Sequence, residues 1–295
     1  MSKISYVNGV YLNHLKATVS IDDRGLQFSD GVYEVVAVWR GAAVDLSYHL
    51  ARLTRSMNKL KFYNQPTRSK IPIVIRQIIR RNRITSGSIY IQVNRGTLKR
   101  NHSYTDLKPP CTCIVTARNG VGPHPNDVET GISLLVQDDE RWKNRDIKSI
   151  SLLPNILSKQ AAIEKGYFDS IFLEPDGTVT ETSTANICYV NKSGTIVTRA
   201  LGSEILGGIT RFRVLLIAKE LGYQIKESIF TIEDLVHANE VFITSTTVFL
   251  LPVHRIGEKL IHRGKPGPIY KSLLNKYYSY LNQLNHKDSW NVQNQ

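Results

Sequence analysis

One lysine has the surroundings that nucleophilic chemistry needs. Lys148 lies among Ile147, Ile150 and Leu152 in the segment RDIKSISLLPN. An amine among apolar side chains is costly to keep charged, and its neutral form is the nucleophile that a Schiff-base enzyme requires. A lysine extending from the protein surface would have the same neighbours in sequence, so this pattern alone leaves both roles open.

A carboxylate and a glycine-rich segment could hold an aromatic phosphate. Glu181 ends the strand-like run TVTE, and a carboxylate beside a pyridine nitrogen would keep that nitrogen protonated. The segment LGGITR, residues 206–211, places two glycines and a threonine where a helix is predicted to begin. Backbone N–H groups at a helix start can bind phosphate. An ordinary strand-end glutamate and an ordinary capped helix remain the alternatives.

An arginine and a histidine could together bind a carboxylate. In an extended segment Arg100 and His102 point to the same side, and a guanidinium beside an imidazole suits a carboxylate ligand. A solvated loop in a basic protein would look the same. Ser245 and Thr246 add hydroxyls at the end of another strand-like run, which is a weaker indication.

The composition narrows the class of protein. The 295 residues are 41% hydrophobic and 21% charged, as in globular proteins, and the net charge is +13. No apolar run of about 18 residues and no secretory signal occur, and the three cysteines lack zinc-type spacing, so we expect a cytoplasmic protein without a metal site. The charge permits anionic ligands. We do not expect nucleic-acid binding, because helix-turn-helix, zinc-finger and RNP patterns are missing.

Other common catalytic motifs do not occur. No GxGxxG follows a strand-like run, no P-loop, GxSxG or HExxH is present, and GKP at residues 264–266 lacks the serine or threonine of a P-loop. Dehydrogenase, NTPase and simple hydrolase functions therefore lose support.

The predicted elements form two α/β domains. Strand-like runs and two helices, one from about Ser47 and one over 69–83, occupy residues 1–118. Residues 119–126 are rich in Gly and Pro and indicate a linker. Residues 127–284 contain a strand, a helix over 153–165, two hairpins, a helix over 209–221 and a strand region over 240–253. The polar residues 285–295 are predicted to be a flexible tail.

Together these segments resemble the fold-type IV PLP (pyridoxal 5′-phosphate) enzymes, which include D-amino acid aminotransferases, branched-chain aminotransferases and 4-amino-4-deoxychorismate lyases. The resemblance covers Tyr6 to Leu281. It implies a smaller N-terminal α/β domain and a larger C-terminal domain with a β-barrel-like core. The matching segments are FSDGVYEVV, HLARL, RDIKSISLLPNILSKQ, DGTVTETSTANICYV, LGGITR, FITSTTVFLLPV and GKPGPI.

The resemblance also implies a role for each candidate residue. Lys148 matches the lysine that binds PLP covalently, whereas Lys159 lies on the following helix and does not match. Glu181 matches the partner of the pyridine nitrogen, and Leu206 matches a residue that packs on the ring. The residues matching the surroundings of the phosphate are Arg52, Ile209, Thr210, Ser245 and Thr246.

The resemblance also has an implication for the substrate. Tyr33, Arg100 and His102 match the residues with which D-amino acid aminotransferases bind the substrate carboxylate. In that family the Arg-x-His loop reaches the neighbouring subunit, so a homodimer is implied, with amino acids and 2-oxo acids as substrates. Ala37 lies where some of these enzymes have a lysine, which leaves the fine preference open. An (R)-selective amine or branched-chain aminotransferase and the lyase remain alternatives.

Overall fold

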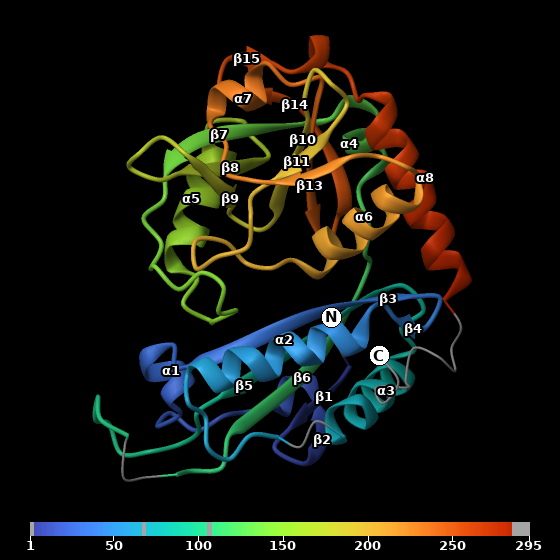
Figure 1. Cartoon of the computed structure of the whole chain (residues 1–295). Helices are drawn as coiled ribbons and strands as arrows, with labels where there is room; N and C mark the ends of the chain where they lie inside the picture. The colour runs from blue at the N-terminus through green and yellow to red at the C-terminus, as the bar shows by residue number, and fades with distance from the viewer. Residues whose placement is uncertain (1–2, 67–68, 105–107, 285–295) are drawn as a thin grey trace. The chain divides into compact units, whose positions relative to one another are not determined.

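The computed structural model describes residues 3–66, 69–104 and 108–284, so the expected tail at 285–295 lies outside the described residues. The chain divides into two units (Figure 1). The first contains Met1–Val121 and Ile147–Ser151, and the second contains Gly122–Asp146 and Leu152–Asn282. The boundary between the units follows Val121. The expected linker at 119–126 stays a prediction.

The short segment Ile147–Ser151 belongs to the first unit, which differs from the expectation that Lys148 is part of the C-terminal domain. The reason is strand-like pairing. Ser149 forms a bridge with Val32, and the backbone N–H of Tyr33 donates to the carbonyl of Lys148 at 2.9 Å. The sequence distance of more than a hundred residues hides this pairing.

A six-stranded antiparallel sheet forms the first unit. Its order is β2-β1-β6-β5-β3-β4. Apolar residues alternate along the strands, as Ile89, Ile91 and Val93 do in β5, and they form one buried face. The predicted Asn8-Gly9 turn joins the first two strands, with φ values of 47° and 102°. The strands are β1 (Ile4–Val7), β2 (Val10–Asn13), β3 (Gly31–Trp39), β4 (Ala42–Ala43), β5 (Gly87–Asn94) and β6 (Thr112–Asn119).

Two amphipathic helices cover that buried face (Figure 1). Helix α2 (Leu46–Lys59) buries Leu50, Leu53 and Met57 at helical spacing, as predicted. Helix α3 (Lys70–Asn82) buries Ile71, Ile75, Ile78 and Ile79, whereas Ile73 is exposed, and its C-cap residue Arg83 adopts the left-handed conformation. The basic residues predicted on this helix therefore lie on its exposed side. A short helix α1 (Arg24–Phe28) precedes β3, and a 3-10 turn η1 covers His14–Lys16.

A mixed nine-stranded sheet forms the second unit. Its path is β12-β11-β10-β13-β14-β7-β8-β9, with β15 paired to β14. β9 also contacts β10, so the sheet curls back on itself. The strands are β7 (Ile132–Asp138), β8 (Asp169–Leu173), β9 (Val179–Thr182), β10 (Asn186–Val190), β11 (Ile196–Thr198), β12 (Ile225–Glu227), β13 (Glu240–Ser245), β14 (Phe249–Ile256) and β15 (Lys259–Leu260).

The strand region expected over residues 240–253 is two strands in the structure. β13 and β14 are antiparallel and pair from Phe242–Pro252 to Ser245–Phe249. Phe249, with a φ of 55°, is where the chain turns back. An apolar run on both sides of a polar STT segment does not distinguish one strand from a hairpin, because both bury the same residues.

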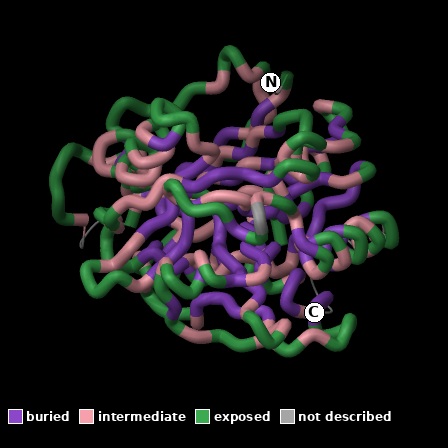
Figure 2. Tube along the Cα trace, turned by 90° about the horizontal axis from the view of Figure 1, so that it is seen from above, coloured by how far each residue is buried: buried purple, intermediate pink, exposed green. Residues whose placement is uncertain are grey.

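Helices lie around the second sheet (Figure 1). Most residues of its inner strands are buried, and Figure 2 shows how the buried residues concentrate inside the molecule. Helix α7 begins with a capping box in which Thr231 and Asp234 bind each other's backbone. In the described part of the chain, none of the helices is long and apolar enough to cross a membrane. The helices are α4 (Pro125–Thr130), α5 (Leu153–Glu164), α6 (Ile209–Glu220), α7 (Ile232–Val236) and α8 (Pro268–Gln283), with a 3-10 turn η2 (His262–Gly264).

Candidate active site

Lys148 lies beside β3 and α2. Its backbone N–H donates to the Ser56 hydroxyl at 3.3 Å, and its Nζ atom lies 4.2 Å from the centre of the Tyr33 ring. Among the described residues, Lys148 has no carboxylate partner for its amine. Lys159 differs, because its Nζ donates to the Phe168 carbonyl and lies 3.8 Å from Asp169 Oδ1. Lys148 is therefore the amine of the two that is available to a ligand.

A buried carboxylate fixes the orientation of the Arg52 side chain. On β3, Glu34 Oε1 accepts from Arg52 Nε at 2.7 Å, and Glu34 Oε2 accepts from Arg52 Nη2 at 2.9 Å and lies 2.7 Å from His49 Nδ1. Burial tends to raise the pKa of Glu34, but Arg52 and His49 lower it to about 2. The carboxylate is therefore ionised and sets the direction of the Arg52 guanidinium. The expected contact of Arg52 with phosphate stays a prediction.

Arg100 and His102 gather around one aromatic ring. The Arg100 guanidinium lies 4.7 Å from the centre of the Phe28 ring, and the His102 ring lies 5.4 Å from it. Arg24 holds this loop, because it donates to the carbonyls of Asn101 at 2.6 Å and His102 at 3.3 Å. Both predicted residues are exposed. Within the described part of one chain, neither contacts Tyr33, whose ring lies beside Tyr90.

Glu181 lies at the centre of a buried group of donors in the second unit. Arg141 Nη1 donates to its Oε1 at 2.6 Å, and Asn186 Nδ2 donates to its Oε2 at 2.9 Å. The Leu206 backbone N–H lies 3.3 and 3.2 Å from the two oxygens. Burial raises the pKa of Glu181, while Arg141 and the Leu206 N–H oppose that rise. Two of the predicted residues, Glu181 and Leu206, are thus in direct contact.

The glycine-rich segment begins helix α6 as predicted. No side chain caps this helix end, so the first backbone N–H groups, at Ile209 and Thr210, are available to an anion. A Cβ atom on Gly208 would clash with Asn186 Oδ1, so a larger residue here would displace the Asn186 side chain. Thr210 is buried, and Thr244 Oγ1 is buried without a partner among the described residues.

Ser245 is the last residue of β13, and Thr246 follows it directly. The Ser245 hydroxyl lies 3.4 Å from the Thr247 hydroxyl, and Ser245 and Thr246 are both half-buried. The structure thus provides the hydroxyls that the sequence predicted at this strand end. Their contact with a phosphate stays a prediction.

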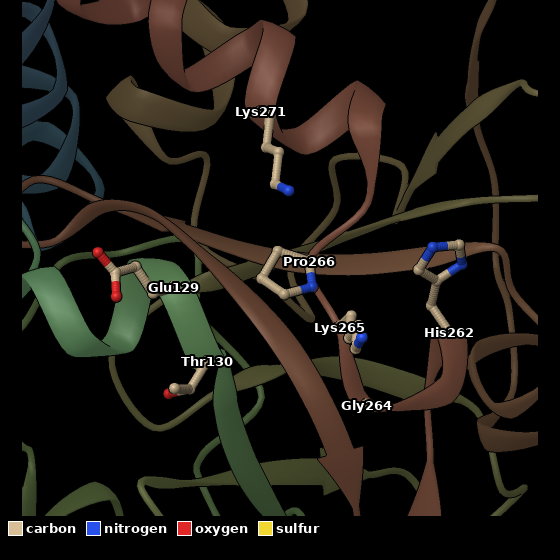
Figure 3. Close-up of a pocket in the computed structure, with 7 residues that line it drawn as sticks. All are labelled: Glu129, Thr130, His262, Gly264, Lys265, Pro266 and Lys271. Carbon is tan, nitrogen blue, oxygen red and sulfur yellow. The ribbon is translucent and has the colours of Figure 1, made fainter.

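A separate pocket of about 490 Å³ lies elsewhere in the second unit (Figure 3). Figure 3 shows Lys271 extending from α8, with Lys265 and His262 from the preceding segment. None of the predicted site residues lines this pocket, and its charged side chains are exposed. The lining residues are Glu129, Thr130, His262, Gly264, Lys265, Pro266 and Lys271.

Four residues of the site were missed in the sequence: Phe28, Glu34, Arg141 and Asn186. Phe28, Glu34 and Asn186 lie inside the segments that carry the family resemblance, but their partners are distant in sequence. Arg141 lies in DDERWKNRD, which has the composition of a solvated loop. Its side chain is nevertheless only 7% exposed.

The fold and these two groups of residues define a class of protein. The chain belongs to the class IV aminotransferases, because the model of the family described as "Amino-transferase class IV" matches residues 31–256. Aminotransferases of this class are PLP enzymes. The predicted family and enzyme class are thereby confirmed.

Within this class the chain is similar to D-alanine aminotransferases. It is 36% identical to the enzyme of Bacillus licheniformis over 267 residues, covering 90% of this chain and 93% of the relative. It is 33% identical to that of Staphylococcus haemolyticus over 281 residues, covering 95% and 98%. The branched-chain amino acid aminotransferase of Escherichia coli superposes with a TM-score of 0.88, covering 98% of each chain. At 23% identity that likeness shows the fold alone.

The residues present fit a phosphorylated pyridine. The uncapped start of α6 and the unpartnered Thr244 hydroxyl suit an anion. The buried carboxylate of Glu181 suits a protonated ring nitrogen. The amine of Lys148, without a carboxylate partner among the described residues, suits covalent attachment to an aldehyde.

Proposed function

We propose that the chain is a PLP-dependent D-amino acid aminotransferase that moves the amino group of a donor such as D-alanine to a 2-oxo acid in a ping-pong reaction. The observation that carries this proposal is the placement of Arg100 and His102 on one aromatic ring, where a carboxylate could meet both the guanidinium and the imidazole. The names and full-length similarity of the D-alanine aminotransferases support the same substrate class.

Each candidate residue has one task toward the cofactor. Lys148 binds PLP through Nζ, and Glu181 accepts a hydrogen bond from the ring nitrogen. Leu206 packs on the ring. The phosphate is bound by the N–H groups of Ile209 and Thr210, by the hydroxyls of Ser245 and Thr246, and by Arg52.

When bound, PLP supplies an aldehyde that takes up the amine and a ring that withdraws electrons from the reacting carbon. The amine of Lys148 would take the proton from the substrate α-carbon and would later give a proton back, acting first as base and then as acid. The Tyr33 ring, 4.2 Å from Nζ, limits the directions that this amine can take. Glu181 keeps the ring nitrogen protonated between the two transfers.

The substrate carboxylate is bound by Tyr33, Arg100 and His102. Since Arg100 and His102 do not contact Tyr33 within the described part of one chain, we propose that they serve the site of a second subunit. A two-fold dimer would then complete each site with the other chain's loop.

Helix α5 offers an apolar surface for such a dimer. Leu153, Ile156 and Leu157 are 59–65% exposed on one side of the helix, followed by Ile163 at 53%. Clustered exposed apolar side chains usually mark an interface.

A lysine buried in this α5 surface would be costly, so Leu157→Lys should shift the protein from dimer to monomer, measured by light scattering after size-exclusion chromatography. Ile229→Lys, at a residue 64% exposed elsewhere, is the matched control and should leave the dimer intact. A Leu157→Lys dimer of unchanged affinity would exclude this surface.

The three cysteines are free thiols, two of them buried. This fits a reducing compartment, and we propose the cytoplasm as the location.

The amino-donor preference tests the proposed substrate. D-alanine, L-leucine and (R)-1-phenylethylamine should be compared with one 2-oxo acid acceptor. We expect D-alanine to give the highest kcat/KM. Preference for L-leucine would indicate a branched-chain enzyme, preference for the amine would indicate an amine transaminase, and no transfer from any of the three would favour the lyase.

A further inference from the structure

Arg141 is a buried cation that the steps described above do not use. Its Nη1 donates to Glu181 Oε1 at 2.6 Å, while Nε and Nη2 donate to the two oxygens of Asp139 at 2.9 and 2.8 Å. The guanidinium also lies 4.6 Å from the centre of the Phe172 ring. Nη2 also donates to the Thr180 hydroxyl at 3.4 Å. A side chain with four directed hydrogen bonds and one stacked face has a single orientation.

Charged side chains of alternating sign lie next to one another around this guanidinium. The Asp139 side chain is fully buried, accepts from the Thr180 hydroxyl at 2.7 Å and lies 3.3 Å from Arg145 Nη2. Burial tends to raise the pKa of Asp139, but Arg141, Thr180 and Arg145 hold it below its usual value. Asp139 is therefore a fixed negative charge behind Arg141. Glu174, paired with Arg145, is a further charged group of this cluster.

The protonation state of Glu181 depends on the Arg141 guanidinium. Burial raises the pKa of Glu181, and the nearby Asp139 charge acts in the same direction. Arg141 is the largest opposing influence. An arginine stays charged and only donates hydrogen bonds, so Oε1 must act as an acceptor. Without Arg141, a buried carboxylate beside Asp139 would tend to take up a proton.

We propose that Arg141 is a positioning residue of the aminotransferase reaction, which donates to the Glu181 carboxylate, fixes it in one orientation and opposes its protonation, so that it can accept a hydrogen bond from the protonated ring nitrogen. This inference rests on the proposed function, because it needs Glu181 to be the partner of that nitrogen. A protonated Glu181 would offer a donor to the ring instead, and the ring would withdraw electrons less well.

The protonation state of Glu181 can be measured in the apoenzyme, independently of turnover. We expect infrared spectra of Arg141→Met at neutral pH to show the carbonyl band of a protonated carboxylic acid. The band should be missing from the wild type and from the Arg141→Met/Glu181→Gln double variant, which assigns it to Glu181. Arg141→Lys keeps the charge and should also lack the band. A spectrum of folded Arg141→Met without the band would overturn the proposal.

A double-mutant cycle in the PLP-loaded enzyme tests the consequence for turnover. Arg141→Met should lower kcat by about 10- to 100-fold and change PLP affinity by less than about threefold, whereas Arg141→Lys should recover most of the loss. In the Glu181→Gln background Arg141→Met should have little further effect, because the carboxylate through which it acts is already removed. Equal losses in both backgrounds would show a general structural role and contradict the proposal.

A second substitution covers the case in which Arg141→Met does not fold. If Arg141→Met does not fold, Arg141→Gln retains hydrogen-bonding capacity without the charge, and it should show the same band and the same loss of kcat. Failure of the proposed function is recognised separately, because the wild-type enzyme would then not transfer the amino group of D-alanine. Failure of this inference leaves that wild-type activity intact.

Discussion

Lys148→Ala should remove the absorbance band of lysine-bound PLP at about 400–430 nm and lower turnover by about four orders of magnitude. The effect is large because one amine both binds the cofactor and moves the proton, and among the described residues no second amine lies at the Tyr33 ring. Absorbance spectra and steady-state rates of the purified variant measure the two losses.

Lys159→Ala is the matched control for this prediction. Its amine is engaged by the Phe168 carbonyl and lies near Asp169, so it is not available to an aldehyde. We expect the variant to keep the absorbance band and a rate close to that of the wild type. If Lys159→Ala loses the band and Lys148→Ala keeps it, the chemistry has been assigned to the wrong lysine.

Arg100→Leu should lower kcat/KM for D-alanine by about 30- to several-thousand-fold, because removing one partner of a desolvated charge pair costs about 2–5 kcal/mol. The leucine can still pack on the Phe28 ring, so the loop retains its apolar contact. The spectrum of bound PLP should stay unchanged. (R)-1-phenylethylamine has no carboxylate, so any activity with it should fall much less.

Lys99→Leu is the control, since it removes a neighbouring exposed cation and should leave D-alanine kinetics unchanged. A subunit-exchange experiment then tests where the loop acts. Mixing inactive Lys148→Ala with inactive Arg100→Leu should restore part of the D-alanine activity, because a mixed dimer contains one site with both residues. Absence of recovery after proven exchange would mean that each subunit uses its own Arg100.

The periodic parts of the chain were predictable. Helix α2 follows from Leu50, Leu53 and Met57 at helical spacing, and the β1–β2 hairpin follows from Asn8-Gly9. The sequence predicted the last residue of helix α6 to within one position, but it did not predict which residues of the helix are buried. Phe212 is 37% exposed while Arg211 is buried against Glu227, because an ion pair with a distant strand decides that side of the helix.

The charged partners within the site were not predictable from one sequence. Glu34 lies in the apolar run GVYEVVAVW, and its partner Arg52 is 18 positions away on a helix. Arg141 and Glu181 are 40 positions apart, in an irregular segment and a strand. Such pairs depend on tertiary packing, about which hydrophobic periodicity contains no information. Lys148 could be proposed from its neighbours, but its pairing with β3 could not.

The most direct test is a single half-reaction with matched enantiomers. The PLP-loaded enzyme should be mixed with D-alanine or L-alanine without any 2-oxo acid acceptor, and the pyruvate released should be measured against time. A ping-pong enzyme must release the first product before the acceptor binds, so we predict a burst of about one pyruvate per subunit from D-alanine and none from L-alanine. A burst from L-alanine alone, or no pyruvate before an acceptor is added, would contradict the proposed D-amino acid transamination.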